Sequence, residues 1–246
     1  MPRFFVDMPL QTGALLALPE EVARHIQVLR LQPGDALTLF NGQGGQYDAR
    51  LAELGKRSAT VELGAFVAVE AEPPYRITLA QGIAGGDKMD WLIEKAIELG
   101  ASHIVPIGTA RAVVRLAGER AARRQAHWQA LIAAACEQCG RNRVPQVEPP
   151  RELLAWLEAL PAAPGDGELR LMLSPRGAQP FDTLPTRAPC AAVTVLIGPE
   201  GGLAPEEEVA AATRGFTPIA LGPRVLRTET AGIAVLAALA ARWGGW

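Results

Sequence analysis

The sequence is poor in several features that would assign a chain to a class at once. Its only lysines are Lys56, Lys88 and Lys95, aromatic residues make up 5% of it, and it has three cysteines in 246 residues. Three cysteines cannot form a disulfide framework of paired bridges. The apolar runs are too short and too interrupted to cross a bilayer, and the first ten residues lack the basic-then-apolar order of a signal peptide. We therefore expect a cytoplasmic protein without a membrane segment.

The chain also lacks an excess of positive charge, since 24 Lys and Arg stand against 26 Asp and Glu, a net charge of -2. A protein that binds nucleic acid through charge alone is usually basic, so any RNA binding must come from local patches. Almost all the positive charge is arginine, which binds phosphate in a bidentate manner and stacks on bases. The same bias, alongside so much Ala, Gly, Pro and Leu, also fits a GC-rich genome, and composition leaves both explanations open.

Hydrophobic residues make up 49% of the chain, which also has 25 glycines and 20 prolines, as in a compact protein of one or two domains. Up to about residue 70, β-type patterns at 36–40, 46–54 and 58–69 surround a glycine-rich turn and follow a predicted helix at 19–31. This pattern predicts a small β-barrel or sandwich over residues 1–70. The Pro73-Pro74 pair marks the boundary, because proline continues neither a helix nor a central strand.

From residue 74 to residue 246, strands and helices alternate. We predict strands at 76–81, 104–107, 169–173, 192–197 and 218–221, and helices at 88–99, 125–139, 152–160, 206–214 and 231–243. Such alternation predicts an α/β fold with a mostly parallel sheet that is covered by helices on both faces.

Two loops follow predicted strands of this sheet, at the carboxyl ends where open α/β sheets bind ligands. The first, residues 196–203, reads Leu-Ile-Gly-Pro-Glu-Gly-Gly-Leu, and its glycines allow a ligand to approach the backbone. It is neither a Walker A loop nor a dinucleotide-binding GxGxxG pattern, and Glu200 would repel a phosphate. A ligand with an adenosine and a positive sulfonium, S-adenosylmethionine (SAM), fits better. The alternative is a tight turn packed on a helix.

The second loop, residues 221–231, gathers polar side chains between a buried strand and a long apolar helix. Thr228 or Thr230 could simply cap the helix, with Glu229 as a partner of its dipole. That alternative does not account for Arg224 and Arg227, because cations are unfavourable at a helix N-terminus. Polar groups clustered at a strand end are instead typical of a binding or catalytic site.

Together, Gly198-Pro-Glu-Gly-Gly202 and residues 221–231 resemble the paired signature of the RsmE family, the 16S rRNA uridine-N3 methyltransferases of the SPOUT superfamily. The resemblance extends over the whole chain, through residues 25–30, the Gly34-Asp35 turn, 95–100 and 137–141. Two departures are slight: Val225 stands where isoleucine is usual, and Cys139 where serine is common.

The resemblance implies a PUA-like β-barrel for RNA over residues 1–70 and a SPOUT domain with a deep trefoil knot over residues 74–246. It implies a homodimer that uses SAM to methylate N3 of one uridine in 16S rRNA of the small ribosomal subunit. Carried over residue by residue, it places the cofactor against Leu196, Gly198, Pro199, Glu200, Gly202, Leu221, Gly222, Leu226, Arg227 and Thr228.

For catalysis we expect Arg227 or Arg224 to stabilise the uridine anion and Glu229 to take the proton, unless Glu229 is a helix cap. The candidate RNA contacts are Arg3, Arg24, His25, Arg30, Arg111, Arg115, Arg123, Arg124 and Arg141. Each could instead be an ordinary surface residue, and His25 could be a structural histidine.

A zinc site at Cys136 and Cys139 would need His127 or Cys190 to complete it, so we expect no metal. Two other functions stay open: methylation of another RNA position, and a non-catalytic RNA-binding factor of the ribosome.

Overall fold

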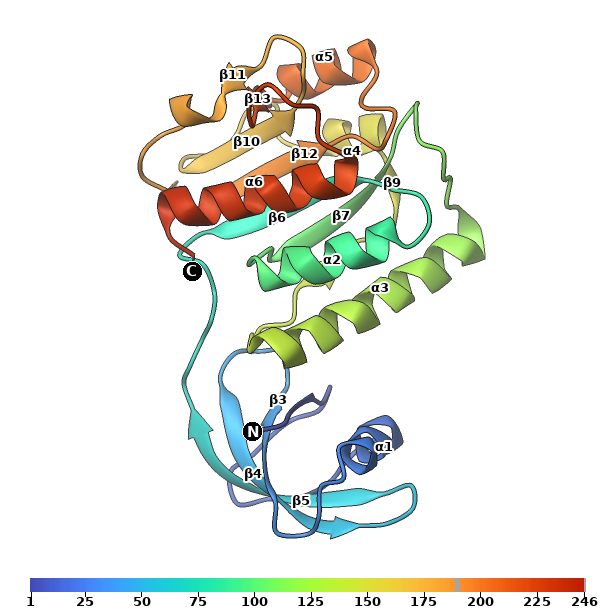
Figure 1. Cartoon of the computed structure of the whole chain (residues 1–246), viewed down its shortest axis with the longest axis vertical. Helices are drawn as coiled ribbons and strands as arrows, with labels where there is room; N and C mark the ends of the chain where they lie inside the picture. The colour runs from blue at the N-terminus through green and yellow to red at the C-terminus, as the bar shows by residue number, and fades with distance from the viewer. Residues whose placement is uncertain (189–190, 246) are drawn as a thin grey trace. The chain divides into compact units, whose positions relative to one another are not determined.

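The computed structural model describes residues 1–188 and 191–245, so Cys190 lies outside the described residues. The chain forms two compact units, which are described separately. The first contains Met1–Glu72 with Ala133–Val144, and the second contains Pro73–Ile132 with Pro145–Trp246. Figure 1 shows the elements of each.

The first unit is built on a five-stranded sheet in the order β1-β3-β4-β5-β2, with β1 parallel to β3 and the other pairs antiparallel. Its elements are β1 (Arg3–Phe5), β2 (Leu15–Ala17), α1 (Glu20–Val28), β3 (Ala36–Phe40), β4 (Gln46–Leu54) and β5 (Ala59–Val67). The predictions at 36–40 and 46–54 are confirmed to the residue. The strands β1 and β2 were not predicted, because three residues are too few to show a period of two.

The core of the first unit lies between α1 and the sheet. Ile26 of α1 is fully buried against Leu37 and Leu39 of β3 and Leu51 of β4. In β4 the buried residues alternate with exposed ones from Ala49 to Leu51, as expected for a sheet with one solvated face.

The segment Ala133–Val144 belongs to the first unit and includes the last residues of α3 (Gly118–Cys139). Its Glu137 carboxylate accepts a hydrogen bond from the backbone N–H of Phe5, at 2.7 Å. Arg141 is buried, with 3% of its side chain exposed, and its guanidinium binds the Glu72 carboxylate through two contacts of 2.9 and 2.5 Å. The expectation that Arg141 contacts RNA is therefore corrected, because a buried and paired guanidinium has no surface left for a phosphate.

The second unit contains an eight-stranded sheet in the order β11-β13-β10-β12-β6-β7-β8, with β9 beside β7. Every strand pairing described in it is parallel, which confirms the predicted mostly parallel α/β sheet. The strands are β6 (Arg76–Gly82), β7 (His103–Gly108), β8 (Gln146–Val147), β9 (Arg151–Glu152), β10 (Glu168–Leu173), β11 (Gln179–Pro180), β12 (Ala192–Ile197) and β13 (Thr217–Ala220).

Helices cover both faces of this sheet. Helices α2 (Lys88–Glu98) and α6 (Thr228–Trp243) pack together on one face, over β6 and β12, and α4 (Leu153–Ala159) and α5 (Pro205–Thr213) pack on the other (Figure 1). A short 3-10 turn, η1 (Phe181–Thr183), follows β11. No helix among the described residues is long and apolar enough to cross a membrane.

Two helices begin earlier than predicted. Helix α3 begins at Gly118 rather than at 125, because its first turns are exposed and carry no apolar period. Helix α6 begins at Thr228 rather than at Ala231, and its N-cap residue is Arg227, which makes no side-chain capping hydrogen bond. Thr228 and Thr230 are therefore not the N-cap, which leaves the Thr228 hydroxyl for another partner.

The buried thiol of Cys136 generates a prediction about cysteine reactivity. Burial raises the pKa of Cys136 to about 12, and its Sγ lies 3.7 Å from the carbonyl oxygen of Arg143. Because the thiolate is the reactive form, we expect native protein at pH 8 to leave Cys136 unmodified by iodoacetamide, and unfolded protein to be modified fully. Peptide mass spectrometry measures both states. Rapid modification of Cys136 in the native state would contradict this environment.

Candidate active site

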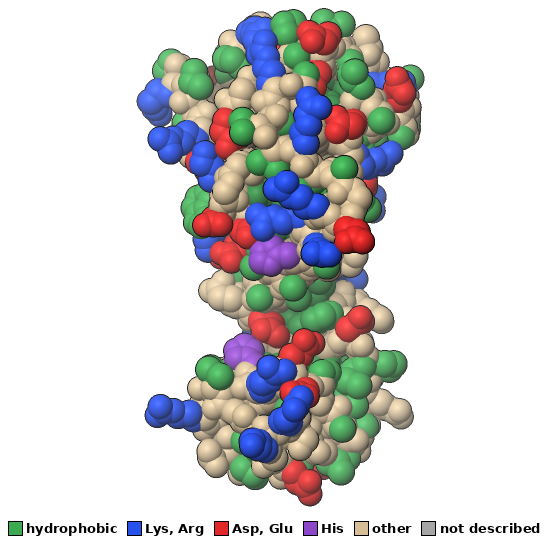
Figure 2. All heavy atoms as spheres, turned by 90° about the vertical axis from the view of Figure 1, so that its right-hand side faces the viewer, with side chains coloured by type: hydrophobic (Ala, Val, Ile, Leu, Met, Phe, Trp, Pro, Cys, Tyr) green, Lys and Arg blue, Asp and Glu red, His purple; other side chains and the backbone are tan. Residues whose placement is uncertain are grey.

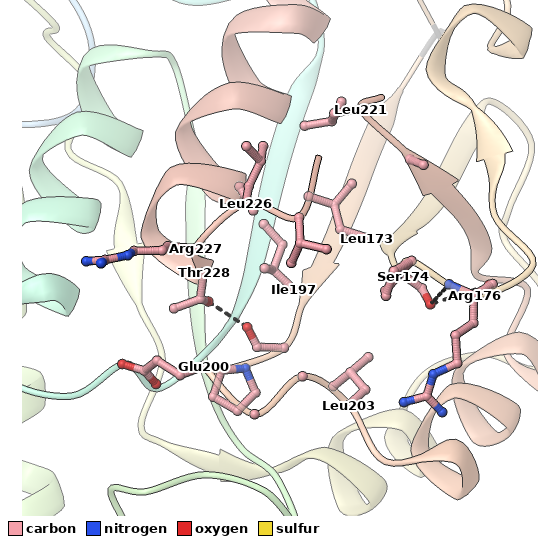
Figure 3. Close-up of a pocket in the computed structure, with 18 of the residues that line it drawn as sticks. Leu173, Ser174, Arg176, Ile197, Glu200, Leu203, Leu221, Leu226, Arg227 and Thr228 are labelled. Carbon is pink, nitrogen blue, oxygen red and sulfur yellow. Dashed lines mark hydrogen bonds between the residues drawn. The ribbon is translucent and has the colours of Figure 1, made fainter. Parts of the chain in front are cut away.

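A pocket of about 760 Å³ opens at the carboxyl ends of β10, β12 and β13, inside the second unit (Figure 3). Its walls are the segments 173–176, 197–203 and 219–228, which follow these three strands. Nine of the ten positions expected to hold the cofactor line it, namely Gly198, Pro199, Glu200, Gly202, Leu221, Gly222, Leu226, Arg227 and Thr228. Arg224 lines it as well.

Leu196 is the expected cofactor residue that does not line the pocket. It is fully buried in the core that β12 shares with α4 and α5, among Met172, Trp156 and Leu203. Successive side chains of a strand point to opposite faces, so the next residue, Ile197, is the one that faces the pocket.

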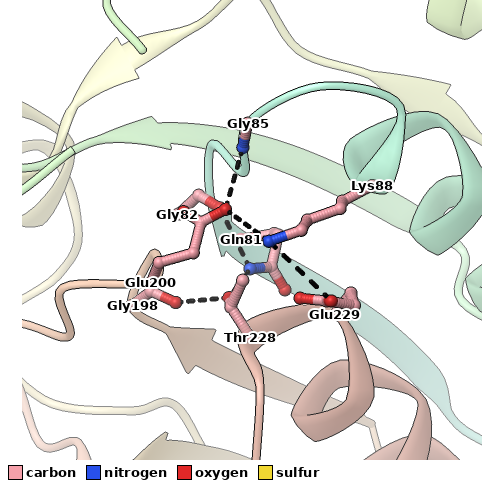
Figure 4. Close-up of polar contacts among 8 residues, drawn as sticks. All are labelled: Gln81, Gly82, Gly85, Lys88, Gly198, Glu200, Thr228 and Glu229. Carbon is pink, nitrogen blue, oxygen red and sulfur yellow. Dashed lines mark hydrogen bonds and ion pairs between the residues drawn. The ribbon is translucent and has the colours of Figure 1, made fainter. Parts of the chain in front are cut away.

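A buried hydroxyl joins three segments beside the pocket (Figure 4). The Thr228 hydroxyl donates a hydrogen bond to the carbonyl oxygen of Gly198, at 2.6 Å, and accepts one from the side-chain amide of Gln81, at 2.8 Å. The same amide donates to the carbonyl oxygen of Gly82, at 3.0 Å. Gln81 is fully buried and Thr228 is 5% exposed. These bonds hold together the ends of β6 and β12 and the start of α6. Because the groups are buried, the low dielectric around them strengthens each hydrogen bond.

The loops meet so closely that glycine is required between them. A Cβ added to Gly82 would lie 2.3 Å from the backbone nitrogen of Pro199, a distance that no side chain allows. Gly202 has φ +68°, in the left-handed region that favours glycine, and its backbone N–H donates to the carbonyl oxygen of Pro199 at 2.8 Å. The loop after β12 is therefore a rigid turn with its backbone turned toward the pocket.

The charge of Glu200 is balanced inside the protein. Its carboxylate accepts a hydrogen bond from the backbone N–H of Gly85, at 3.0 Å, and pairs with the ammonium of Lys88, at 3.1 Å. Burial tends to raise the pKa of Glu200, but backbone hydrogen bonds and Lys88 outweigh it and hold that pKa below its ordinary value. The carboxylate is thus ionised but already neutralised by Lys88. The sequence argument that Glu200 would repel a phosphate did not include Lys88, which balances this charge.

Helix α5 anchors the far end of the same loop. The Glu207 carboxylate is buried and accepts hydrogen bonds from the backbone N–H groups of Ala204 and Ala110, each at 2.8 Å. Arg111 donates to the carbonyl oxygens of Gly201 and Leu203, at 3.3 and 3.2 Å. Arg111, expected as an RNA contact, is therefore part of the pocket wall.

The residues at the end of β10 also line the pocket, which was not predicted from the sequence. Leu173, Ser174, Pro175 and Arg176 line the pocket, and Ser174 and Arg176 lie across it from Glu200 (Figure 3). The Ser174 hydroxyl lies 2.9 Å from the Glu208 carboxylate and accepts the backbone N–H of Arg176 at 3.1 Å. The available signal was the position of Ser-Pro-Arg-Gly directly after a predicted strand, which is where loops of parallel sheets bind ligands.

Two of the three catalytic candidates, Arg224 and Arg227, line the pocket, and Glu229 follows them in the chain without lining it. Arg227 and Glu200 extend to the same side in Figure 3, and Glu229, in the first turn of α6, has a carboxylate oxygen 3.9 Å from the Lys88 ammonium. The other carboxylate oxygen of Glu229 is buried without a hydrogen-bond partner among the described residues. Arg224 is exposed on the loop at the rim.

The RNA candidates of the first unit differ in their surroundings. Arg24 and Arg30 are exposed, and Arg30 has a left-handed φ of 58° directly after α1. His25 is 48% exposed and lies edge-on to Phe4. Arg3 donates to the side-chain oxygens of Gln46 and Asn142, and burial lowers its pKa. Arg3 is thus committed to contacts inside the protein.

In the second unit, Arg115 is exposed, and a groove of about 510 Å³ is lined by Glu119, Arg120, Arg123, Arg124 and His127. Arg123 pairs with Glu119, and Arg124 pairs with Asp90 and lies over the Trp128 ring. Figure 2 shows basic and acidic side chains interspersed on the face that it draws. On this face basic groups are therefore mixed with acidic ones, and a local RNA-binding patch stays a prediction. Among residues 1–188 and 191–245, no cluster of three or more His, Cys, Asp or Glu side chains could hold a metal ion.

Comparison with known proteins agrees with this geometry. A family model described as an RNA methyltransferase domain matches residues 71–240, and one described as an RNA methyltransferase PUA domain matches residues 18–64. The ribosomal RNA small subunit methyltransferase E of Buchnera aphidicola subsp. Schizaphis graminum is 30% identical over 99% of this chain and 97% of that protein. The protein of the same name from Bacillus subtilis is 28% identical over 97% and 96%.

A solved structure is similar over nearly the full length. The ribosomal RNA small subunit methyltransferase E of Neisseria gonorrhoeae, bound to S-adenosyl methionine, is 38% identical. It superposes with a TM-score of 0.91 and covers 99% of this chain and 98% of its own.

The buried hydroxyl of Thr228 yields a second prediction. Thr228→Val keeps the shape of the side chain but leaves the Gly198 carbonyl and the Gln81 amide each one partner short. We expect a loss of about 1–3 kcal/mol for each buried group left unsatisfied, and weaker cofactor binding because the two loops separate. Thr228→Ser, which keeps the hydroxyl, is the matched control. Denaturant titration and calorimetric Kd check both, and a Val variant as stable as wild type would refute the role of this hydroxyl.

Proposed function

We propose a specific methyl transfer for this chain, which belongs to the RsmE family of SAM-dependent ribosomal RNA methyltransferases. It moves the methyl group of SAM to N3 of one uridine of 16S rRNA in the small ribosomal subunit, the position numbered 1498 in the family's target. The observation that carries the proposal is the pocket at the carboxyl ends of β10, β12 and β13. Both signature loops meet there and are joined by the Thr228 hydroxyl.

The residues of the pocket fit SAM. Ile197, Leu203 and Leu226 offer apolar surface for an adenine ring, and the backbone at Gly202 and Gly222 is open where a Cβ would meet no other atom within 4 Å. Backbone groups of residues 197–203 and 221–228 would hold the adenosine. When bound, SAM supplies a methyl group activated by its sulfonium.

For the two parts of the chain we propose the roles expected from the resemblance. Residues 1–70 are a PUA-like β-barrel domain that binds RNA, and residues 74–246 are the SPOUT methyltransferase domain. The deep trefoil knot of the SPOUT domain is proposed on the resemblance, because true knots are very rare and local patterns do not indicate them.

We further propose a homodimer that acts in the cytoplasm. The Val225 side chain, 88% exposed at the rim of the pocket, is an apolar surface that a second copy could cover. The RNA contacts we retain are the exposed residues Arg24, His25, Arg30, Arg111, Arg115 and Arg123, together with the half-buried Arg124. Their guanidinium or imidazole groups can meet phosphates.

The chemistry at uridine N3 requires loss of an imide proton that is held at neutral pH. Arg227, and Arg224 at the rim, would stabilise the negative charge that spreads over O2 and O4 of the base. Glu229, whose carboxylate lies 3.9 Å from the Lys88 ammonium, is the carboxylate proposed to accept the proton. Alignment of N3 with the methyl carbon supplies the remaining rate gain.

The direct test is transfer of labelled methyl from SAM to small ribosomal subunits that lack the modification, with free 16S RNA in parallel. We expect label in 3-methyluridine at one position, mapped by nuclease digestion. Label at another nucleotide would reassign the target and keep the enzyme class. Absence of SAM binding would refute the proposed function.

Arg227→Ala tests the electrostatic role of this side chain. Because Arg227 is exposed and serves as an N-cap without a capping hydrogen bond, the variant should fold normally. We expect kcat to fall about 10²–10³-fold, as for loss of one group that stabilises a developing anion. Calorimetry should show SAM binding retained. Wild-type turnover in this variant would exclude the role.

A further inference from the structure

Lys88 occupies a position in the pocket that no sequence motif indicated. It is the first residue of α2, lines the pocket, and is 38% exposed. Its ammonium lies 3.1 Å from the Glu200 carboxylate and 3.9 Å from that of Glu229, so it stands between the loop after β12 and the first turn of α6 (Figure 4).

The two carboxylates leave part of the ammonium free for a ligand. An ammonium group has three N–H donors, and Glu200 accepts one of them. The 3.9 Å separation from Glu229 is an ion pair but too long for a hydrogen bond. Lys88 lines the pocket, so its remaining donors are available to a ligand there.

Other cations of the pocket are placed differently. Arg111 is bound to the carbonyl oxygens of Gly201 and Leu203, and Arg176 lies across the pocket from Glu200 (Figure 3). Arg227 shares the side of Glu200. Lys88 is thus the cation that an ion pair places beside the Glu229 carboxylate, and Arg227 lies on the Glu200 side of the pocket.

We propose that Lys88 is a catalytic residue, whose ammonium binds one carbonyl oxygen of the target uracil and stabilises the N3 anion while Glu200 and Glu229 hold it in place. This inference rests on the proposed function and adds the group that the sequence argument lacked. Uracil has carbonyls on both sides of N3, so Lys88 binds one and Arg227 the other.

The reaction balances with these groups. The N3 proton passes to the Glu229 carboxylate, and the N3 electron pair forms the bond to the methyl carbon. The carbon–sulfur bond breaks and its electrons remain on sulfur as a neutral thioether. Lys88 stays protonated throughout, and Glu229 returns its proton to water. The Lys88 ammonium lowers the barrier to methyl transfer because it stabilises the negative charge of the uracil, which is largest after the N3 proton has left.

The test compares Lys88→Met, which removes the charge and keeps the length, with Lys88→Arg, which keeps the charge. Lys95→Met is the matched control, because Lys95 lies on the same helix and is also ion-paired, with Glu98 at 2.6 Å, but does not line the pocket. Each is assayed for kcat, SAM Kd and thermal stability on unmodified small subunits. We expect kcat to fall about 10²-fold in Lys88→Met, with SAM Kd unchanged and substantial recovery in Lys88→Arg. Lys95→Met should retain wild-type kcat.

A second readout separates anion stabilisation from a purely structural role. Fluorine at C5 makes the N3 proton of uracil more acidic, so 16S RNA made with 5-fluorouridine needs less help to ionise. The deficit of Lys88→Met should shrink on that substrate and as pH rises. The charged groups that line the pocket are Lys88, Arg111, Arg176, Glu200, Glu208, Arg224 and Arg227, and Glu229 lies beside Lys88. If Lys88→Met unfolds, Lys88→Gln replaces it.

Three results would overturn the inference. They are wild-type kcat in Lys88→Met, a deficit that is equal on both substrates at every pH, and a deficit that is fully explained by weaker SAM binding. Failure of the proposed function is distinguishable from all three, because wild-type protein would then form no 3-methyluridine before any variant is compared.

Discussion

The hydroxyl of Thr228 is the contact on which the pocket depends. It is buried between the carbonyl oxygen of Gly198 and the side-chain amide of Gln81, and it joins segments that lie 30 and 147 positions apart in the chain. A buried polar group without a hydrogen-bond partner lowers the stability of the fold. The hydroxyl, the carbonyl and the amide therefore stabilise it only when all three are in place. The ends of β6 and β12 and the start of α6 are consequently held in one arrangement, which places both signature loops around the same cavity.

Around that contact the pocket wall consists mainly of backbone groups and of charged side chains that are paired within the protein. Gly82 lets the loop after β12 approach β6, and Glu207 holds the far end of that loop by accepting two backbone N–H groups. Glu200 is paired with Lys88 instead of facing the ligand as a free charge. The resulting wall offers apolar side chains where an adenosine would lie, and Lys88 and Arg227 are on the same side of the pocket as Glu200.

Much of the fold was predictable because its local patterns agree with the tertiary structure. The strands at 36–40, 46–54 and 192–197 were predicted to the residue, since their apolar and β-branched runs are bounded by turn residues. The parallel sheet followed from alternation of strands and helices. The three-residue strands β1 and β2, and the early start of α6, escaped prediction because tertiary contacts, rather than local period, place them.

The sequence by itself determined the alternation that makes the sheet parallel, the two loops at its carboxyl edge and the family resemblance that they carry. Only the tertiary structure decided which side chains act there. It turned Leu196 into the core and Ile197 toward the pocket, buried Arg141 against Glu72, and brought Gln81 and Lys88 beside residues more than a hundred positions away. The physical reason is that a side chain's role follows from burial and partners across the sheet, and these depend on contacts distant in sequence that no local pattern records.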